Sequence, residues 1–300
     1  MRRLFRWIVF LGLIGLAVFW WVTQPTRIDS NQIVNLTGDA DKGARVFYAG
    51  GCASCHAAPN AEGDAKLVLA GGKSFPSPFG TFFAPNISPG ENGLAGWNAE
   101  DLANAMIHGT SPDGSHYFPA FPYTSYARTD LQDIVDLKAY LDTLPVSDQA
   151  NQPHDVPFPF NIRRSLGGWK FLFAGRGPVI DVGDDEKLAL GQYLVEGLGH
   201  CGECHTSRNF LGGLRMNRWL AGGPNPDGPG RIPNITPHET GLTWSNADIE
   251  EYLFSGFTPE FDVAGGQMAD VVQNTGNLTP EDRAAMAAYL KAVIALPTEN

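Results

Sequence analysis

The sequence is poor in positive charge. It contains 21 lysines and arginines against 32 aspartates and glutamates, and its formal net charge is -11. This balance argues against a nucleic-acid partner, because neutralising phosphates requires clustered lysine and arginine. An acidic surface is better suited to docking a basic protein partner.

Regular alternation of apolar and polar residues, the pattern of half-buried strands, is also lacking. We therefore predict an all-α fold. The 300 residues and the hydrophobic content of 43% are sufficient for two folded units. The 35 glycines and 22 prolines are scattered without a period, which indicates compact units with much loop.

No small-x-small cleavage site follows the apolar N-terminus, so a cleaved signal peptide is the less favoured interpretation. Residues 7–22 form an unbroken apolar run, and a segment starting at Leu4 would reach the roughly 30 Å of a bilayer core. Arg2 and Arg3 precede this run, and tryptophans lie near both of its ends. We predict a single-pass anchor over residues 1–25 in the inner membrane, with the remaining chain in the periplasm.

An internal repeat divides the rest of the chain, with an offset of about 149 residues, from Cys52 to Cys201. The repeated features are an apolar segment before each cysteine pair, Pro-Asn-Ile-Ser-Pro at 85–89 against Pro-Asn-Ile-Thr-Pro at 233–237, and a tryptophan at 97 and 244. We expect two tandem domains over residues 36–146 and 185–297. A proline-rich linker at 147–184 joins them, and its apolar part at 169–173 is predicted to strap across both.

Each copy is predicted to contain three helices. The first leads into the cysteine pair. The second starts after Asn98 or Ser245, each an N-cap with an acidic residue three positions later. The third starts at Thr129, with Gln132 closing a capping box, or at Thr279, with Pro280 in the first helical position and Asp282 in the third. Each runs to a Leu-Pro pair.

Both copies carry a Cys-x-x-Cys-His motif, and together the two motifs use all four cysteines of the chain. In this motif two thiols form thioethers with the haem vinyl groups, and the adjacent histidine binds the iron. A redox dithiol or half a zinc site is the alternative for a single motif, but a zinc ribbon places its cysteine pairs about 15 to 20 residues apart. We predict two covalently bound haems c. Their residues are Cys52, Cys55 and His56 for haem 1, and Cys201, Cys204 and His205 for haem 2.

The second axial ligand decides whether the iron is closed to small molecules, and methionine in that position raises the potential. Of the five methionines, Met1 starts the chain, Met286 lies inside the last predicted helix, and Met216 lies in a loop. Met268 lies in a predicted loop before the last helix, where chain can cross the distal face of haem 2. We therefore predict Met268 as the iron ligand of haem 2.

The position equivalent to Met268 in the first half is Phe121, which cannot bind iron. We predict His116 as the distal ligand of haem 1, since it lies in the corresponding loop. Met106 and His108 on the preceding helix, a solvent-facing His116 and an open iron remain alternatives. His154, His200 and His238 are expected to be surface residues.

With both motifs, the two Pro-Asn-Ile segments, Pro-Ala-Phe-Pro-Tyr at 119–123 and Met-Ala-Asp-Val-Val at 268–272, the chain resembles bacterial membrane-anchored dihaem cytochromes c. It is also similar to the cytochrome c subunits of periplasmic alcohol and aldehyde dehydrogenases. The resemblance implies class I cytochrome c domains with His56 and His205 as proximal ligands and Met268 as a distal ligand. Those subunits typically carry three motifs, and many have methionine in the place of Phe121.

The predicted function is relay of single electrons in a periplasmic respiratory chain. The donor would be a dehydrogenase or a quinol-linked complex, and the acceptor a terminal oxidase or similar protein. One alternative is a permanent electron-accepting subunit of a dehydrogenase. The other is an enzyme of peroxidase or thiosulfate dehydrogenase type that reacts at haem 1.

Overall fold

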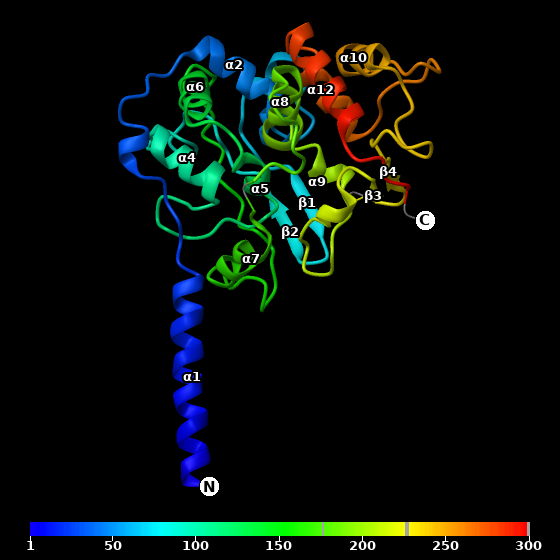
Figure 1. Ribbon diagram of the computed structural model, residues 1–300. Helices are drawn as coiled ribbons and strands as arrows, with labels where there is room; N and C mark the ends of the chain where they lie inside the picture. Colours follow the sequence, from blue (N-terminus) through cyan, green and yellow to red (C-terminus); the bar gives the residue numbers. More distant parts are fainter. Residues whose placement is uncertain (176, 226–227, 299–300) are drawn as a thin grey trace.

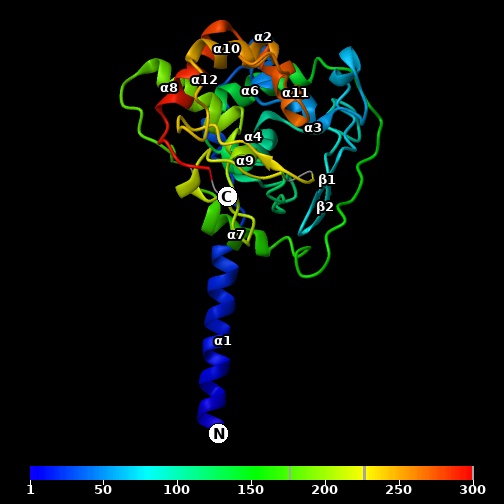
Figure 2. The same cartoon turned by 90° about the vertical axis from the view of Figure 1, so that its right-hand side faces the viewer.

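One long helix projects from an otherwise packed chain. The computed structural model describes residues 1–175, 177–225 and 228–298. Helix α1 (Arg2–Val22) has no buried residue, and the remaining elements gather beyond its C-terminal end (Figures 1 and 2). Within the described residues, α1 is the one helix that is long and apolar enough to cross a membrane.

The two halves use corresponding helices. The first half contains α2 (Ala40–Ala49), α3 (Cys52–His56), α4 (Ala99–His108), α5 (Tyr123–Tyr126) and α6 (Leu131–Leu141). The second contains α8 (Glu186–Gln192), which continues as the π-helical turn η3 (Tyr193–Leu198), and then α9 (Gly202–His205), α10 (Asn246–Ser255), α11 (Gln267–Thr275) and α12 (Pro280–Ala292). Short 3-10 turns are η1 (Ser30–Gln32), η2 (Gly63–Leu67) and η4 (Met216–Arg218).

The capping boxes predicted at three helix starts are confirmed. Asn98, Ser245 and Thr279 each accept a hydrogen bond from the backbone three residues on, and an aspartate there returns the bond. The prediction for α6 is wrong by one residue, because Asp130 is its N-cap and Thr129 is buried in the preceding turn. Gln132 instead donates to the carbonyl of Thr37 and to Asp136.

Close helix crossings depend on one glycine in each half. A Cβ atom on Gly43 of α2 would lie 2.0 Å from the carbonyl oxygen of Asp136 in α6. A Cβ atom on Gly191 of α8 would lie 2.1 Å from the carbonyl oxygen of Ala285 in α12. No side chain fits at such distances, so α2 with α6 and α8 with α12 pack backbone against backbone.

The prediction of a purely helical chain needs a correction, because the fold is mostly helical but has two short antiparallel hairpins. Strand β1 (Ser74–Ser77) pairs with β2 (Gly80–Phe83), and β3 (Gly223–Pro224) pairs with β4 (Arg231–Ile232). Strands of two to four residues are too short to show the alternation that identifies a strand in a sequence.

The predicted linker contains a helix, α7 (Ser165–Phe173), which lies beside the end of α1 (Figure 1). As the strap prediction required, this helix contacts both halves. The indole Nε1 of Trp169 donates to the carbonyl oxygen of Leu211 at 2.8 Å, and the Trp169 ring packs edge-on against Tyr123.

A continuous core joins the halves, with Phe47 and Ile134 from one and Leu198 and Tyr289 from the other. Ion pairs also cross between them: Arg45 with Asp282, Arg128 with Glu196, and Lys66 with Asp270. The two copies of the repeat are therefore packed directly against each other.

Candidate haem sites

Each Cys-x-x-Cys-His motif forms a short helix immediately after a longer one. Between them the chain turns through a left-handed residue, Gly51 with φ of 59° and His200 with φ of 39°. Such a backbone is easy for glycine and uncommon for histidine, so His200 is held there by its surroundings. Its Nε2 atom lies 3.3 Å from the carbonyl oxygen of Gly50. His200 is thus half-buried against the first half, rather than fully on the surface as expected.

The histidines of both motifs are oriented in the same way. Nδ1 of His56 lies 2.8 Å from the carbonyl oxygen of Pro85, and Nδ1 of His205 lies 2.9 Å from that of Pro233. Because a carbonyl only accepts, Nδ1 must carry the proton, which leaves the Nε2 lone pair for a metal. Burial lowers the pKa of both imidazoles and so favours the neutral, metal-binding form.

The two prolines begin the repeated Pro-Asn-Ile segments, and the asparagines hold these segments in place. The Asn86 amide donates to the carbonyls of Ser147 and Gln149. In the second half the Asn234 amide donates to the carbonyl of Leu296 at 2.7 Å. The start of the linker therefore fixes the turn that orients His56, and the end of the second half fixes the turn that orients His205. The sequence repeat marked these segments but did not explain this role.

The cysteines are in an environment that suits thioethers rather than thiolate chemistry. Burial raises the pKa of Cys52 and of Cys201 to about 12, and none of the four is in a disulfide. A redox dithiol needs a thiolate nucleophile, which a lowered pKa supplies. Within residues 1–175, 177–225 and 228–298, no three His, Cys, Asp or Glu side chains are grouped as a metal-ion site. The donor set fits haem c.

Met268 lies in the first turn of α11, two residues after the N-cap Gly266, rather than in a loop as expected. It is half-buried and packs against the core. Met216 is 45% exposed on η4, whereas Met286 and Met106 are buried core residues. Ligation of iron by Met268 stays a prediction.

Phe121 lies in a group of aromatic rings, with centroids 5.9 Å from Tyr117 and 5.7 Å from Tyr126. The neighbouring Tyr123 is buried, and its hydroxyl has no hydrogen-bond partner in the described part of the chain. His108 is buried at the end of α4. The first half therefore offers aromatic rings and one buried hydroxyl where the second half offers Met268.

His116 is buried, but both of its ring nitrogens already have partners. Nε2 lies 2.9 Å from the carbonyl oxygen of Thr23, and Nδ1 lies 3.0 Å from Nζ of Lys170. The carbonyl accepts and the ammonium donates, so the imidazole is neutral with its proton on Nε2. Iron binding would require one of these bonds to break, and the predicted ligation by His116 is not supported by this geometry.

The residues in front of the two motifs contact each other. Besides His200, the hydroxyl of Tyr126 donates to the carbonyl oxygen of Gly50 at 3.4 Å, and the rings of Tyr126 and His200 meet edge-on. Gly50 precedes Cys52 by two residues and His200 directly precedes Cys201. The two haem sites are thus neighbours.

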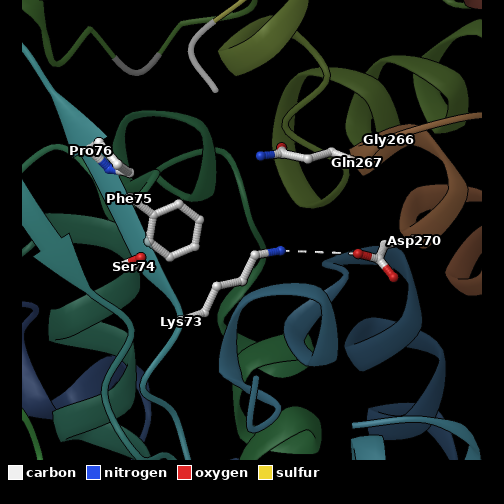
Figure 3. A pocket seen from close by; sticks show the side chains of 7 residues that line it. All are labelled: Lys73, Ser74, Phe75, Pro76, Gly266, Gln267 and Asp270. Atoms are coloured by element: carbon white, nitrogen blue, oxygen red, sulfur yellow. Dashed lines mark ion pairs between the residues drawn. The ribbon is translucent and has the colours of Figure 1, made fainter. Parts of the chain in front are cut away.

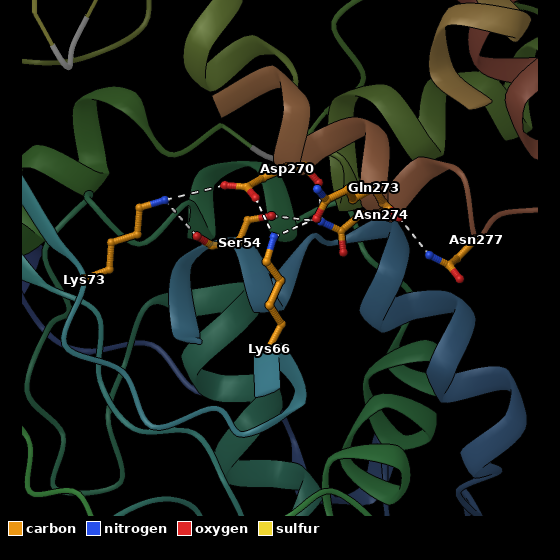
Figure 4. A network of polar contacts seen from close by, with 7 residues as sticks. All are labelled: Ser54, Lys66, Lys73, Asp270, Gln273, Asn274 and Asn277. Atoms are coloured by element: carbon orange, nitrogen blue, oxygen red, sulfur yellow. Dashed lines mark hydrogen bonds and ion pairs between the residues drawn. The ribbon is translucent and has the colours of Figure 1, made fainter. Parts of the chain in front are cut away.

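Helix α11 connects the sites a second time (Figure 4). Its Asn274 donates to the hydroxyl of Ser54, inside the first motif, at 2.8 Å. Lys66 pairs with Asp270 at 2.8 Å, and Lys73 donates to the carbonyl of Ser54. Between β1 and α11 lies an open cleft of about 480 Å³, lined by Lys73, Phe75 and Gln267 among others (Figure 3).

Comparison with known proteins agrees with this site. The cytochrome c family profile matches residues 40–145. A protein of Cereibacter sphaeroides named "Diheme cytochrome c-type" is 58% identical over 299 residues, covering 99% of this chain and all of that protein.

Two further relatives are longer. The fructose dehydrogenase cytochrome subunit of Gluconobacter japonicus is 36% identical over 90% of this chain. The cytochrome c subunit of the quinone-type alcohol dehydrogenase of Gluconobacter oxydans is 36% identical over 85% of this chain. The chain spans 55% of the length of each. From the match over its whole length to the Cereibacter protein, together with the two histidine sites, we conclude that the chain belongs to the dihaem c-type cytochromes of the cytochrome c family.

Proposed function

We propose that the protein is a membrane-anchored electron carrier with two tandem cytochrome c domains, over residues 36–146 and 185–297. Haem c, when bound, supplies an iron that changes between two oxidation states by one electron. Cys52, Cys55, Cys201 and Cys204 would hold the two groups as thioethers. His56 and His205 would bind iron through Nε2, and Met268 would be the second protein ligand of the haem 2 iron.

The observation that carries this proposal is the contact between the two motifs. One-electron transfer falls off steeply with distance, and here Gly50 and His200 bond across the boundary between the halves. The surrounding residues Phe47, Leu198 and Tyr126 are buried and give the low polarity that shields a redox centre from water. No substrate pocket is needed for such a role.

The stoichiometry has a direct test. Pyridine haemochrome analysis of the full-length protein should give two haems per chain. The pair of replacements Cys52→Ser and Cys55→Ser should leave one, as should Cys201→Ser with Cys204→Ser. A value near zero for the unaltered chain would overturn the assignment.

The anchor is the second part of the proposal. Helix α1 is exposed along its length, and Arg2, Arg3 and Arg6 at its start favour a cytoplasmic N-terminus with the haem domains in the periplasm. A cleaved signal sequence would have the same composition. The mass of the purified protein and its retention in membranes washed at alkaline pH distinguish the two, since cleavage would lower the mass below that of the full 32.4 kDa chain and release the protein.

Two partnerships fit the carrier role. The first is a relay between a dehydrogenase or quinol-linked donor and a terminal acceptor. The second, favoured by the names of the longer relatives, is a permanent cytochrome subunit of a dehydrogenase complex. Purification in mild detergent separates them, because a permanent partner would remain in stoichiometric amount.

An enzyme reacting at haem 1 is the remaining alternative, and Phe121 is the feature that permits it. Carbon monoxide added to the reduced full-length protein tests this. Slow or absent binding at both haems is expected of a carrier, and rapid binding at one haem under native conditions would favour the enzyme.

A further inference from the structure

The C-terminal end of α1 is clamped onto the rest of the molecule. Arg164 donates to the carbonyl oxygen of Trp20 at 2.7 Å and to the hydroxyl of Thr23 at 2.8 Å, and its guanidinium lies 4.2 Å from the centroid of the Trp20 ring. Thr23 is buried, and its carbonyl accepts from His116. Arg164 and His116 therefore each satisfy one carbonyl group that the helix end leaves without a partner, that of Trp20 and that of Thr23.

The contact is too close for a flexible tether. A Cβ atom on Gly167 of α7 would lie 2.6 Å from Cα of Thr23 and 2.9 Å from Nε2 of His116. The axis of α1 is thereby fixed relative to α7. If α1 crosses a bilayer, this contact also determines which residues of the globular part lie level with the membrane surface. That surface lies at Trp20 and Trp21, where interfacial aromatics belong.

Three segments lie at this height. Helix α7, the green segment that leads into it and the yellow-green loop that follows α9 are all at the end of the globular part from which α1 projects (Figures 1 and 2). They are joined by contacts: Trp169 bonds the carbonyl of Leu211, and the rings of Phe79 and Phe160 are 5.2 Å apart. A Cβ atom on Gly212 would touch Phe79.

These segments expose large apolar side chains. We call the surface formed by six of these side chains the α7 face: Phe158, Phe160, Ile162, Phe171, Leu172 and Phe210. Phe171 is 73% exposed, Phe158 77% and Phe210 87%. A surface with this many exposed aromatic and aliphatic side chains marks an interaction site.

The charge around the α7 face is opposite to that of the protein. Residues 156–175 contain Arg163, Arg164 and Lys170 but no aspartate or glutamate. Residues 204–226 contain three arginines and no acid, although one of them, Arg208, pairs with Glu203 just before this segment. The chain as a whole carries a net charge of -11. Apolar side chains flanked by basic ones favour the headgroup region of a bilayer that contains anionic phospholipid.

We infer that the α7 face lies in the outer headgroup layer of the membrane that α1 crosses, so that the haem domains rest on the bilayer in one fixed orientation. This inference depends on the proposed anchor. The occupant is lipid because the face is continuous with the exit point of α1 and at the same height. Helix α10 and the loop after it then point away from the membrane (Figures 1 and 2).

Spin labels measure this placement. With the native cysteines held as thioethers, one introduced cysteine is the only reactive thiol of the full-length protein. Labels at Phe158→Cys and Phe171→Cys are compared with one at Phe261→Cys, which is 92% exposed after α10. The protein is reconstituted in vesicles of phosphatidylethanolamine and phosphatidylglycerol, and accessibility to oxygen and to a water-soluble nickel chelate is recorded.

The labels at 158 and 171 are expected to be accessible to oxygen and shielded from the nickel chelate. The label at 261 is expected to be accessible to the nickel chelate and less accessible to oxygen. Equal nickel accessibility at all three sites would overturn the inference. It would be the result for a face that binds a protein partner, because the vesicles contain no other protein and the face would stay in water. In a second variant, Phe171→Glu with Leu172→Glu, label 158 should become accessible to nickel while the haem spectrum stays unchanged. Failure of the protein to float with the vesicles would instead disprove the anchor itself.

Discussion

Asn274 of α11 donates a 2.8 Å hydrogen bond to the hydroxyl of Ser54, which lies between the two cysteines of the first motif. The first turn of the same helix contains Met268, the predicted ligand of haem 2. One helix therefore touches the attachment site of one haem and is predicted to ligate the other. A displacement of α11 should be felt at both irons.

Replacing Asn274 with alanine should shift the reduction potentials of both haems. It removes the bond to Ser54 and should lower the free energy of unfolding by about 1 kcal/mol. Redox titration followed at the haem absorption bands measures the two potentials. Asn277→Ala is the matched control, because Asn277 is exposed and its side-chain amide donates within the same segment, to the carbonyl of Gln273. A shift in one potential alone would contradict the coupling.

The asparagines of the two Pro-Asn-Ile segments should act on one haem each. Asn86→Ala frees the turn whose Pro85 carbonyl orients His56, and Asn234→Ala does the same for Pro233 and His205. Each should destabilise the protein by about 1 to 3 kcal/mol, since buried partners are left without a bond. Potentiometry on both variants is the measurement, and each is the control for the other. Equal effects on both haems would speak against separate sites.

Removal of the Met268 thioether tests the distal ligand of haem 2. Met268→Ala should lower the potential of one haem by a substantial part of the roughly 0.8 V range that axial ligands set. It should also open that iron to carbon monoxide. Met216→Ala, at an exposed methionine on η4, should change neither property. Unaltered spectra in Met268→Ala would assign the ligand elsewhere.

His116 should make stability depend on acidity. Burial, and the neighbouring charges of Lys170, Arg164 and Arg163, lower its pKa below the ordinary 6.5 while the hydrogen bond to Thr23 acts in the opposite direction. Below pH 6.5 the unfolded chain then takes up a proton that the folded chain does not, so stability falls as the pH decreases towards the folded pKa. Above pH 6.5 the His116 imidazole is neutral in both the folded and the unfolded chain, so the free energy of unfolding no longer depends on its protonation.

His116→Gln is the test, because an amide can donate to Thr23 and accept from Lys170 but does not titrate. Thermal unfolding of the two proteins should give similar midpoints above pH 7 and a growing advantage for the variant at acidic pH. A constant difference across the pH range would remove His116 as the source. Loss of a low-spin haem 1 signal in the variant would restore the prediction that His116 binds iron.

Much of the helical framework was predictable because its signals are local. The capping boxes at Asn98, Ser245 and Thr279 depend on residues three positions apart, and such spacing is legible in a sequence. The hairpins β1–β2 and β3–β4 were not, since their strands are too short for a period. The role of His200 was missed for another reason, because its partner Gly50 lies in the other half of the chain.

By itself the sequence determined the two haem-attachment motifs, the repeat that contains them and the apolar N-terminal helix, because covalent chemistry and periodicity need only neighbouring residues. Tertiary structure decided what these parts do to one another. The carbonyl of Pro85 orients His56, and that of Pro233 orients His205. His116 hydrogen-bonds to Thr23 and Lys170, and Arg164 donates to the carbonyl of Trp20. Each of these is a hydrogen bond between groups far apart in the chain, and only packing selects which distant donor meets which acceptor.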